Sequence, residues 1–217
     1  MHSKQSFGYA GQMINGPILT VAYSAPPIDR RELLRYMGCR AETEDVSMLI
    51  DSVIEEARPI LQYRVCYREA ALQQNGASLS FCSLSVESRM LAKCLENCTG
   101  VILFAATVGL PFDRLLAKYT HTSPSRAVAL QALGAERVES LCNAFMKTLQ
   151  DEYAPKGYAL KPRFSPGYGD LSLSFQADLF RVLDCPKRIG VTLCENCLMS
   201  PSKSVTAIVG AFHNGVK

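Results

Sequence analysis

The sequence predicts an α+β fold built on a mainly antiparallel sheet, and three observations support this prediction. Residues 101–107 (VILFAAT) form a short apolar run that is typical of a buried central strand. Apolar residues recur at helical spacing over 123–152, and the Ser-Pro pair at 123–124 is a favourable helix start. Strands and helices are mixed without a regular βα repeat, which disfavours a parallel, doubly wound sheet.

Capping and turn residues set the other elements. Asp29 is a suitable N-cap for a helix that Gly38 would end, and Asn75-Gly76 predicts a turn between two strands. Helices are predicted over 30–38, 46–57, 85–97, 123–152 and 174–184, and strands over 60–70, 77–82, 101–107, 188–194 and 204–212, with 158–163 extended. Residues 1–28 are expected to form an irregular or extended N-terminal arm, and 1–217 a single domain.

Composition excludes several classes of protein. The chain has 217 residues, of which 48% are hydrophobic and 20% charged, as in ordinary globular domains. Its net charge of +3 is too small for a dense basic face, so nucleic acid is not an expected partner. The apolar runs are too short to span a membrane, and the first residues lack the apolar core of a signal peptide. We therefore expect a cytoplasmic protein.

The nine cysteines are odd in number, which favours reduced thiols in a cytosol over a disulfide framework. Cys194 and Cys197 have the spacing of half a zinc site, but two further ligands would be needed. A redox pair and plain packing thiols are the other interpretations of these two residues. Packing is the simplest, and no metal site is predicted.

The segment 163–169 (RFSPGYG) is the most specific candidate for chemistry. Pro166-Gly167 predicts a tight turn, because glycine accepts a positive φ and lets a backbone approach a ligand. Arg163 has a planar guanidinium that suits a carboxylate, and Tyr168 offers a ring and a hydroxyl. The pattern fits an amphoteric, aromatic ligand, although a surface turn with a solvated arginine has the same spacing.

A polar, proline-containing connection between the last two predicted strands is the second candidate. It spans 193–205 (LCENCLMSPSKSV) and carries Glu195 and Lys203. A solvated hairpin would account for the same composition.

Both segments resemble motifs of the activation domain of cobalamin-dependent methionine synthase. Residues 163–168 match that family's R-x-x-P-G-Y loop, and 193–205 are similar to its L-T-E-S-x-x-M-x-P-x-x-S-V stretch. The start of the first helix, IDRRELLRYMG, looks like that of free-standing family members. The resemblance is clear over 158–210 and looser over 28–157.

The resemblance implies a curved antiparallel sheet flanked by helices, with S-adenosylmethionine in a groove beside the R-x-x-P-G-Y loop. It makes Arg163 the clamp for the ligand carboxylate and implies no acid, base or nucleophile of the chain's own. Candidate ligand-binding residues are Arg163, Phe164, Ser165, Pro166, Gly167, Tyr168, Glu139, Glu195 and Asp29. The sequence departs from the family at Ser140, where an ungapped match expects the glutamate of the long helix, and near Val209, where a tyrosine is expected.

Three hypotheses follow. The first is a reactivation module that presents S-adenosylmethionine to cobalamin on a separate protein. That protein would be a methionine synthase lacking its own activation domain, or another corrinoid protein, with flavodoxin as the electron donor that the resemblance suggests. The second is a non-enzymatic interaction module of the same fold that has lost the ligand. The third is a thiol or metal protein built on Cys194 and Cys197.

Overall fold

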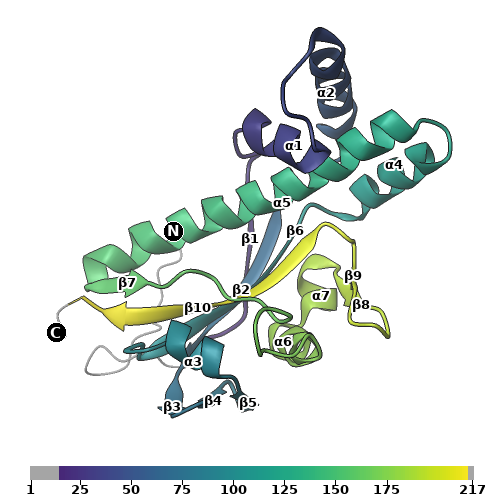
Figure 1. Ribbon diagram of the computed structural model, residues 1–217. Coiled ribbons are helices and arrows are strands. Elements are labelled where there is room, and N and C mark those ends of the chain that lie inside the picture. Colours follow the sequence, from purple (N-terminus) through teal and green to yellow (C-terminus); the bar gives the residue numbers. More distant parts are fainter. Residues whose placement is uncertain (1–14, 215–217) are drawn as a thin grey trace.

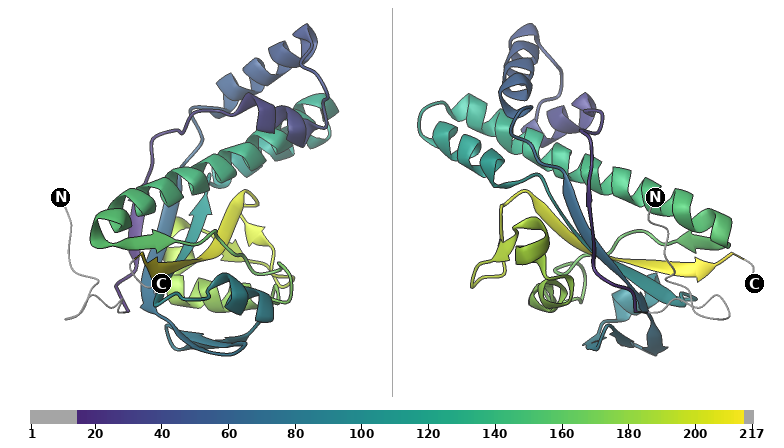
Figure 2. Two further views of the ribbon diagram at one scale, coloured as in Figure 1. Left: turned by 60° about the vertical axis from the view of Figure 1, so that its left-hand side comes forward. Right: turned by 180° about the vertical axis from the view of Figure 1, so that it is seen from behind.

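A five-stranded antiparallel sheet organises the chain, which a computed structural model describes over residues 15–214 (Figure 1). The strand order is β1-β2-β6-β10-β7, so strands far apart in the sequence become neighbours. These strands are β1 (Leu19–Ala22), β2 (Arg64–Ala71), β6 (Gly100–Thr107), β7 (Tyr158–Leu160) and β10 (Ser204–His213). The sheet is strongly twisted and curved, as Figure 2 shows. The predicted α+β class with a curved, mainly antiparallel sheet is confirmed.

Two small β elements lie beside this sheet. One is a three-stranded meander of β3 (Gln73–Asn75), β4 (Ser78–Phe81) and β5 (Leu84–Glu87). The other is a hairpin of β8 (Thr192–Leu193) and β9 (Met199–Ser200), in which Thr192 pairs with Ser200.

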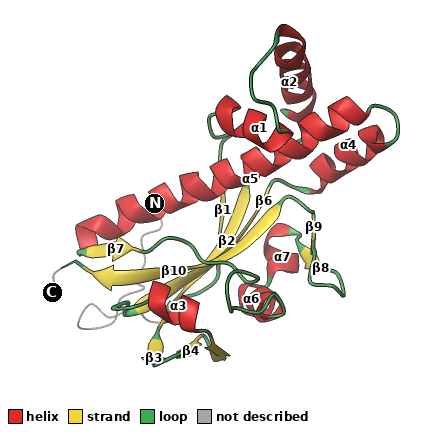
Figure 3. Ribbon diagram, in the orientation of Figure 1, coloured by secondary structure: helices red, strands yellow, loops and turns green. Residues whose placement is uncertain are grey.

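Helices cover both faces of the sheet (Figures 2 and 3). On one face lies the thirty-residue α5 (Pro124–Tyr153), which ends in the 3-10 turn η1 (Ala154–Lys156). The helices α1 (Arg30–Met37), α2 (Glu44–Ala57) and α4 (Leu110–Thr120) pack against α5. On the other lie α3 (Arg89–Cys94), α6 (Phe175–Leu183) and α7 (Cys185–Ile189).

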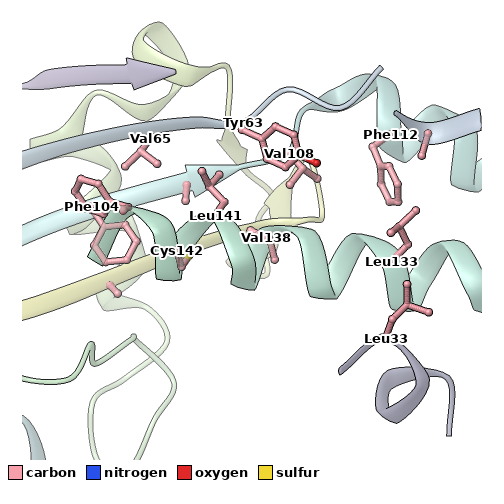
Figure 4. Close-up of a cluster of buried hydrophobic side chains, with 14 of the residues drawn as sticks. Leu33, Tyr63, Val65, Phe104, Val108, Phe112, Leu133, Val138, Leu141 and Cys142 are labelled. Atoms are coloured by element: carbon pink, nitrogen blue, oxygen red, sulfur yellow. The ribbon is translucent and has the colours of Figure 1, made fainter. Parts of the chain in front are cut away.

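The core has two halves, one on each face of the sheet. The central strand β6 lies between them and is buried along its whole length. Side chains alternate along a strand, so Ile102 and Phe104 face α5, whereas Val101 and Leu103 face the other half of the core, which includes residues of α3, α6 and α7. Figure 4 shows Phe104 packed among side chains of the first half, including Leu141 of α5. The continuous apolar run at 101–107 is therefore a central strand, as predicted.

Several predicted elements are confirmed at their ends. Asp29 caps α1 by accepting the backbone N–H of Arg31 and Glu32 at 3.0 and 3.2 Å. Gly38 ends that helix with a φ of 73°, a conformation that favours glycine. The long helix runs over Pro124–Tyr153, close to the predicted 123–152.

Two of the predicted secondary-structure elements were wrong. Residues 188–194 were expected to form a strand, but the helix α7 occupies Cys185–Ile189 and the strand β8 only Thr192–Leu193. Pro186 in the first turn favours that helix, and Gly190 ends it with a φ of 72°. Residues 85–97 were expected to be one helix, but the strand β5 continues to Glu87 and α3 begins only after Ser88. The Ser88 hydroxyl caps α3 by accepting the Leu91 N–H.

The helix α4 was not predicted from the sequence. The predicted arm is extended over residues 15–28, where it contains β1, and its residues 1–14 lie outside the described part of the chain. Within residues 15–214, no helix is long and apolar enough to cross a membrane.

Candidate functional site: a groove beside the 163–171 loop

The loop after β7 is fixed to the sheet at its first residues. Phe164 exchanges two backbone hydrogen bonds of 2.8 Å with Ile208 of β10. The chain then turns at Ser165–Tyr168, where the Tyr168 N–H donates to the Ser165 carbonyl at 3.2 Å. Gly167 has a φ of 90°, as the third residue of a type II turn requires, so the predicted tight turn is present.

Asp170 anchors the far end of this loop. Its carboxylate accepts hydrogen bonds from the Ser88 hydroxyl and from the backbone N–H of Arg89 and Met90, the latter two at 2.7 and 3.2 Å. Residues near both ends of the loop are therefore bound to separate elements, β10 and α3, before any ligand is considered.

The loop forms one wall of a groove of about 650 Å³. The opposite walls come from α5, the β8–β9 connection and the start of β10. Lining residues named from the sequence are Glu139, Arg163, Phe164, Ser165, Pro166 and Tyr168, and the others are Leu173, Gln176, Cys197, Leu198, Met199, Ser202, Ser204, Val205 and Thr206. Tyr168, Leu173 and Leu198 remain largely exposed and give the groove an apolar rim.

An ion pair joins two walls of the groove. The Arg163 guanidinium contacts the Glu139 carboxylate and lies 3.5 Å from the Asn143 side-chain oxygen. The Arg163 side chain is 25% exposed, so it lies along the groove and is not extended into solvent. Burial works against its charge, but Cys142 and Glu139 outweigh that effect and raise the pKa of Arg163.

Glu139, and not Ser140, is the residue of α5 that lines the groove. The Ser140 hydroxyl instead donates to Glu136 at 2.7 Å, on another side of the helix. Val209, where the resemblance expects a tyrosine, is fully buried in the core against α5. That position therefore offers no side chain to the groove.

Two other candidates lie away from the groove. The Asp29 carboxylate caps α1, and Asp29 is not among the lining residues. Glu195 is exposed in the turn between β8 and β9 and does not line the groove either. Gly167 shapes the turn beside the groove without contributing to its lining.

Gln176 and Thr206 form a polar patch in the groove that sequence reasoning missed. Both side chains are buried, and the Thr206 hydroxyl donates to Gln176 Oε1 at 3.2 Å. Gln176 Nε2 donates to the Cys197 carbonyl at 2.7 Å, which ties α6 to the β8–β9 connection. The sequence does single out Gln176, because this polar residue occupies the apolar stripe of α6 that continues at Leu179, Phe180 and Leu183.

The cysteines do not gather into a ligand cluster. Within residues 15–214, no three His, Cys, Asp or Glu side chains lie close enough together to hold a metal ion. Cys66 and Cys185 are buried beside each other, and Cys194 is exposed.

The groove thus combines one cation, one anion, polar amide and hydroxyl groups and apolar surfaces. A cation and an anion in contact suit the two ends of a zwitterion, because each can bind the opposite charge. The apolar rim suits a flat ring.

No family model matches the sequence, and no curated protein matches it. Its fold, however, is similar to that in a crystal structure of the MetH reactivation domain bound to AdoHcy, with a TM-score of 0.71 and 14% sequence identity. This chain has the fold of the MetH reactivation domain. The match covers 93% of this chain and 80% of the MetH chain, so the shared architecture extends far beyond the two sequence motifs.

Proposed function

We propose that the groove binds S-adenosylmethionine, and that the chain is a reactivation module for a corrinoid protein. The observation that carries the proposal is the contact between Arg163 and Glu139 on the wall of a groove large enough for a nucleoside. The MetH reactivation domain of the same fold was crystallised with AdoHcy, the demethylated form of this ligand.

Each part of the ligand has a chemical counterpart in the groove. The α-carboxylate would pair with the Arg163 guanidinium, and the α-ammonium with the Glu139 carboxylate. The adenine ring would lie against the apolar rim of Tyr168, Leu173 and Leu198. The existing ion pair would open to admit both charges, so no charged side chain would be left without a partner.

The role of the chain would be positioning. S-adenosylmethionine supplies a methyl group to cobalamin on a partner protein, and one electron comes from a reductant such as flavodoxin. Holding the donor at the mouth of an open groove makes the transfer effectively intramolecular once the partner docks. The partner would be a methionine synthase without its own activation domain, or another corrinoid protein.

Calorimetry with S-adenosylmethionine and AdoHcy tests the binding step. We expect both to bind, and Arg163→Ala to weaken binding by about a hundredfold, because a bidentate carboxylate contact is lost. Arg181→Ala is the matched control, since Arg181 is an exposed arginine paired with Asp178 outside the groove. The absence of heat for the wild type at millimolar ligand would refute the proposal.

Ligand dependence separates this function from a pure interaction module. Methylcobalamin formation on a corrinoid protein, followed by visible absorbance, should require the chain, S-adenosylmethionine and a reductant together. Docking without any effect of the ligand on affinity or turnover would favour the interaction module instead.

A further inference from the structure

Cys194 and Cys197 close the turn between β8 and β9 at the edge of the groove. The Cys197 N–H donates to the Cys194 carbonyl at 3.0 Å, and the Cys194 N–H donates to the Leu198 carbonyl at 2.9 Å. A four-residue turn brings the first and fourth Cα atoms within about 7 Å. Disulfides span Cα separations of about 4.4–6.8 Å, so the turn holds these residues within bonding reach.

This pair differs from the other thiols in accessibility. Of the nine cysteines, all within the described residues, Cys194 alone is exposed. Burial raises the pKa of Cys142 to about 12 and that of Cys98 to about 11, which keeps both thiols protonated and weakly nucleophilic. An external reagent therefore meets Cys194 first.

The turn shares residues and a hydrogen bond with the wall of the groove. Cys197 lines the groove, and its carbonyl accepts the 2.7 Å hydrogen bond from Gln176. Cys197 also has a φ of 61°, a left-handed conformation that is uncommon for a residue with a side chain. Leu198 and Met199, which follow directly, are groove residues as well. The turn and this wall of the groove are therefore parts of one continuous segment.

We propose that Cys194 and Cys197 form a reversible disulfide by exchange with a small-molecule disulfide, and that this bond reshapes the groove and weakens ligand binding there. The effect on ligand affinity rests on the function proposed above, whereas formation of the bond and the change in the groove wall do not.

The exchange balances in two steps. The Cys194 thiolate attacks one sulfur of the small-molecule disulfide, forms a mixed disulfide and releases one thiolate. The Cys197 thiolate then attacks the Cys194 sulfur and releases the second. The protein loses two electrons and two protons, and the reagent gains them as two thiols. An excess of reduced thiol reverses both steps.

Mass spectrometry of the whole chain, incubated with oxidised or reduced glutathione, tests bond formation. Trypsin releases residues 189–203, which contain Cys194 and Cys197 and no other cysteine. It also releases 94–114, which contain Cys94 and Cys98 and serve as an internal control. We expect peptide 189–203 to lose two hydrogens and to resist alkylation, while 94–114 stays reduced. A glutathione adduct that never resolves, or an unchanged peptide 189–203, would overturn the proposal.

Hydrogen–deuterium exchange in the oxidised and reduced states tests the connection to the groove without any ligand. Exchange rates should change in residues 172–182 and 189–206 and stay the same in α2. Unchanged rates at 172–182 would overturn the coupling.

Calorimetry then compares ligand binding by the two states. S-adenosylmethionine should bind about tenfold more weakly to the oxidised chain. Cys194→Ser, which leaves the groove lining intact, should bind like the reduced wild type under both conditions. Equal affinity in the two wild-type states would refute the gating, whereas no binding in the reduced state would instead refute the proposed function.

Discussion

The Arg163 guanidinium contacts the Glu139 carboxylate although the two residues are 24 positions apart in the chain. Both side chains are partly exposed, at 25% and 38%. Exposed ion pairs contribute about 0–1 kcal/mol to folding, so stability alone is a weak reason for this contact. Under the proposed function, the contact instead offers a ligand a pair of opposite charges.

Glu139→Gln separates these two roles. The change keeps the shape of the side chain and removes its charge, so we expect S-adenosylmethionine to bind about tenfold more weakly with little change in Tm. Calorimetry and thermal unfolding measure the two effects. 5′-Methylthioadenosine, which lacks the amino-acid portion, should bind equally to the variant and the wild type. An equal loss for both ligands would contradict the assignment.

Asp170→Asn should make the stability of the loop less dependent on pH. The Ser88 hydroxyl, helped by the Arg89 and Met90 N–H groups, holds the pKa of Asp170 below its usual range. A carboxyl group whose pKa is lower in the folded state than in the unfolded state stabilises the fold at pH values above the unfolded-state pKa of about 3.9. This stabilisation is lost as the pH falls through the folded-state pKa. Thermal unfolding should therefore show a variant that melts lower than the wild type at pH 7, with a difference that shrinks as the pH falls below about 4. A constant difference across this range would exclude the carboxylate as its source.

Glu136→Gln tests a buried ion pair in α5. Glu136 and Arg137 are each 1% exposed, and Arg137 also donates to the carbonyls of Pro26 and Pro27 at 2.6 and 2.8 Å. Removing the anion leaves a buried charge without its partner, which destabilises proteins by about 3–5 kcal/mol. Urea unfolding measures this loss. Glu32→Gln is the control, because its pair with Arg35 is exposed and contributes below about 1 kcal/mol.

Gly134→Ala should destabilise the packing of α4 against α5. A Cβ atom at this position would lie 2.4 Å from Cε1 of the buried Phe112. Alanine gains about 1 kcal/mol in helix propensity, but overpacking costs about 1–3 kcal/mol, so the clash outweighs the gain. The double variant with Phe112→Leu should lose less stability than the sum of the two single changes. Strict additivity in urea unfolding would argue against this contact.

The sequence was informative wherever a local pattern determined the structure. The apolar run at 101–107, the caps at Asp29 and Gly38, and the turn at Pro166-Gly167 each depend on nearby residues, and each is confirmed. The segment 188–194 was misassigned because the alternating apolar residues Ile189, Val191 and Leu193 suit a strand. In the structure, Ile189 belongs to the helix α7, and tertiary packing buries its side chain in the core. The helix α4 had a signal, since Phe112, Leu115 and Leu116 have helical spacing after Pro111.

The site was only partly predictable for a related reason. The loop residues share one motif, but Gln176, Leu198 and Thr206 reach the groove from three other segments. Contacts between distant segments depend on the sheet order, which a single sequence does not specify. Asp29 and Glu195 carry suitable charges, yet the fold places both away from the groove.

The groove draws its walls from the middle of α5, the loop after β7 and the first residues of β10. A ligand bound in the groove would contact three segments that separate when the chain unfolds. It would therefore stabilise the folded state, and the stabilisation would increase with its affinity and concentration. Melting curves recorded against pools of metabolites would then reveal what the groove accepts, even before any partner protein is in hand.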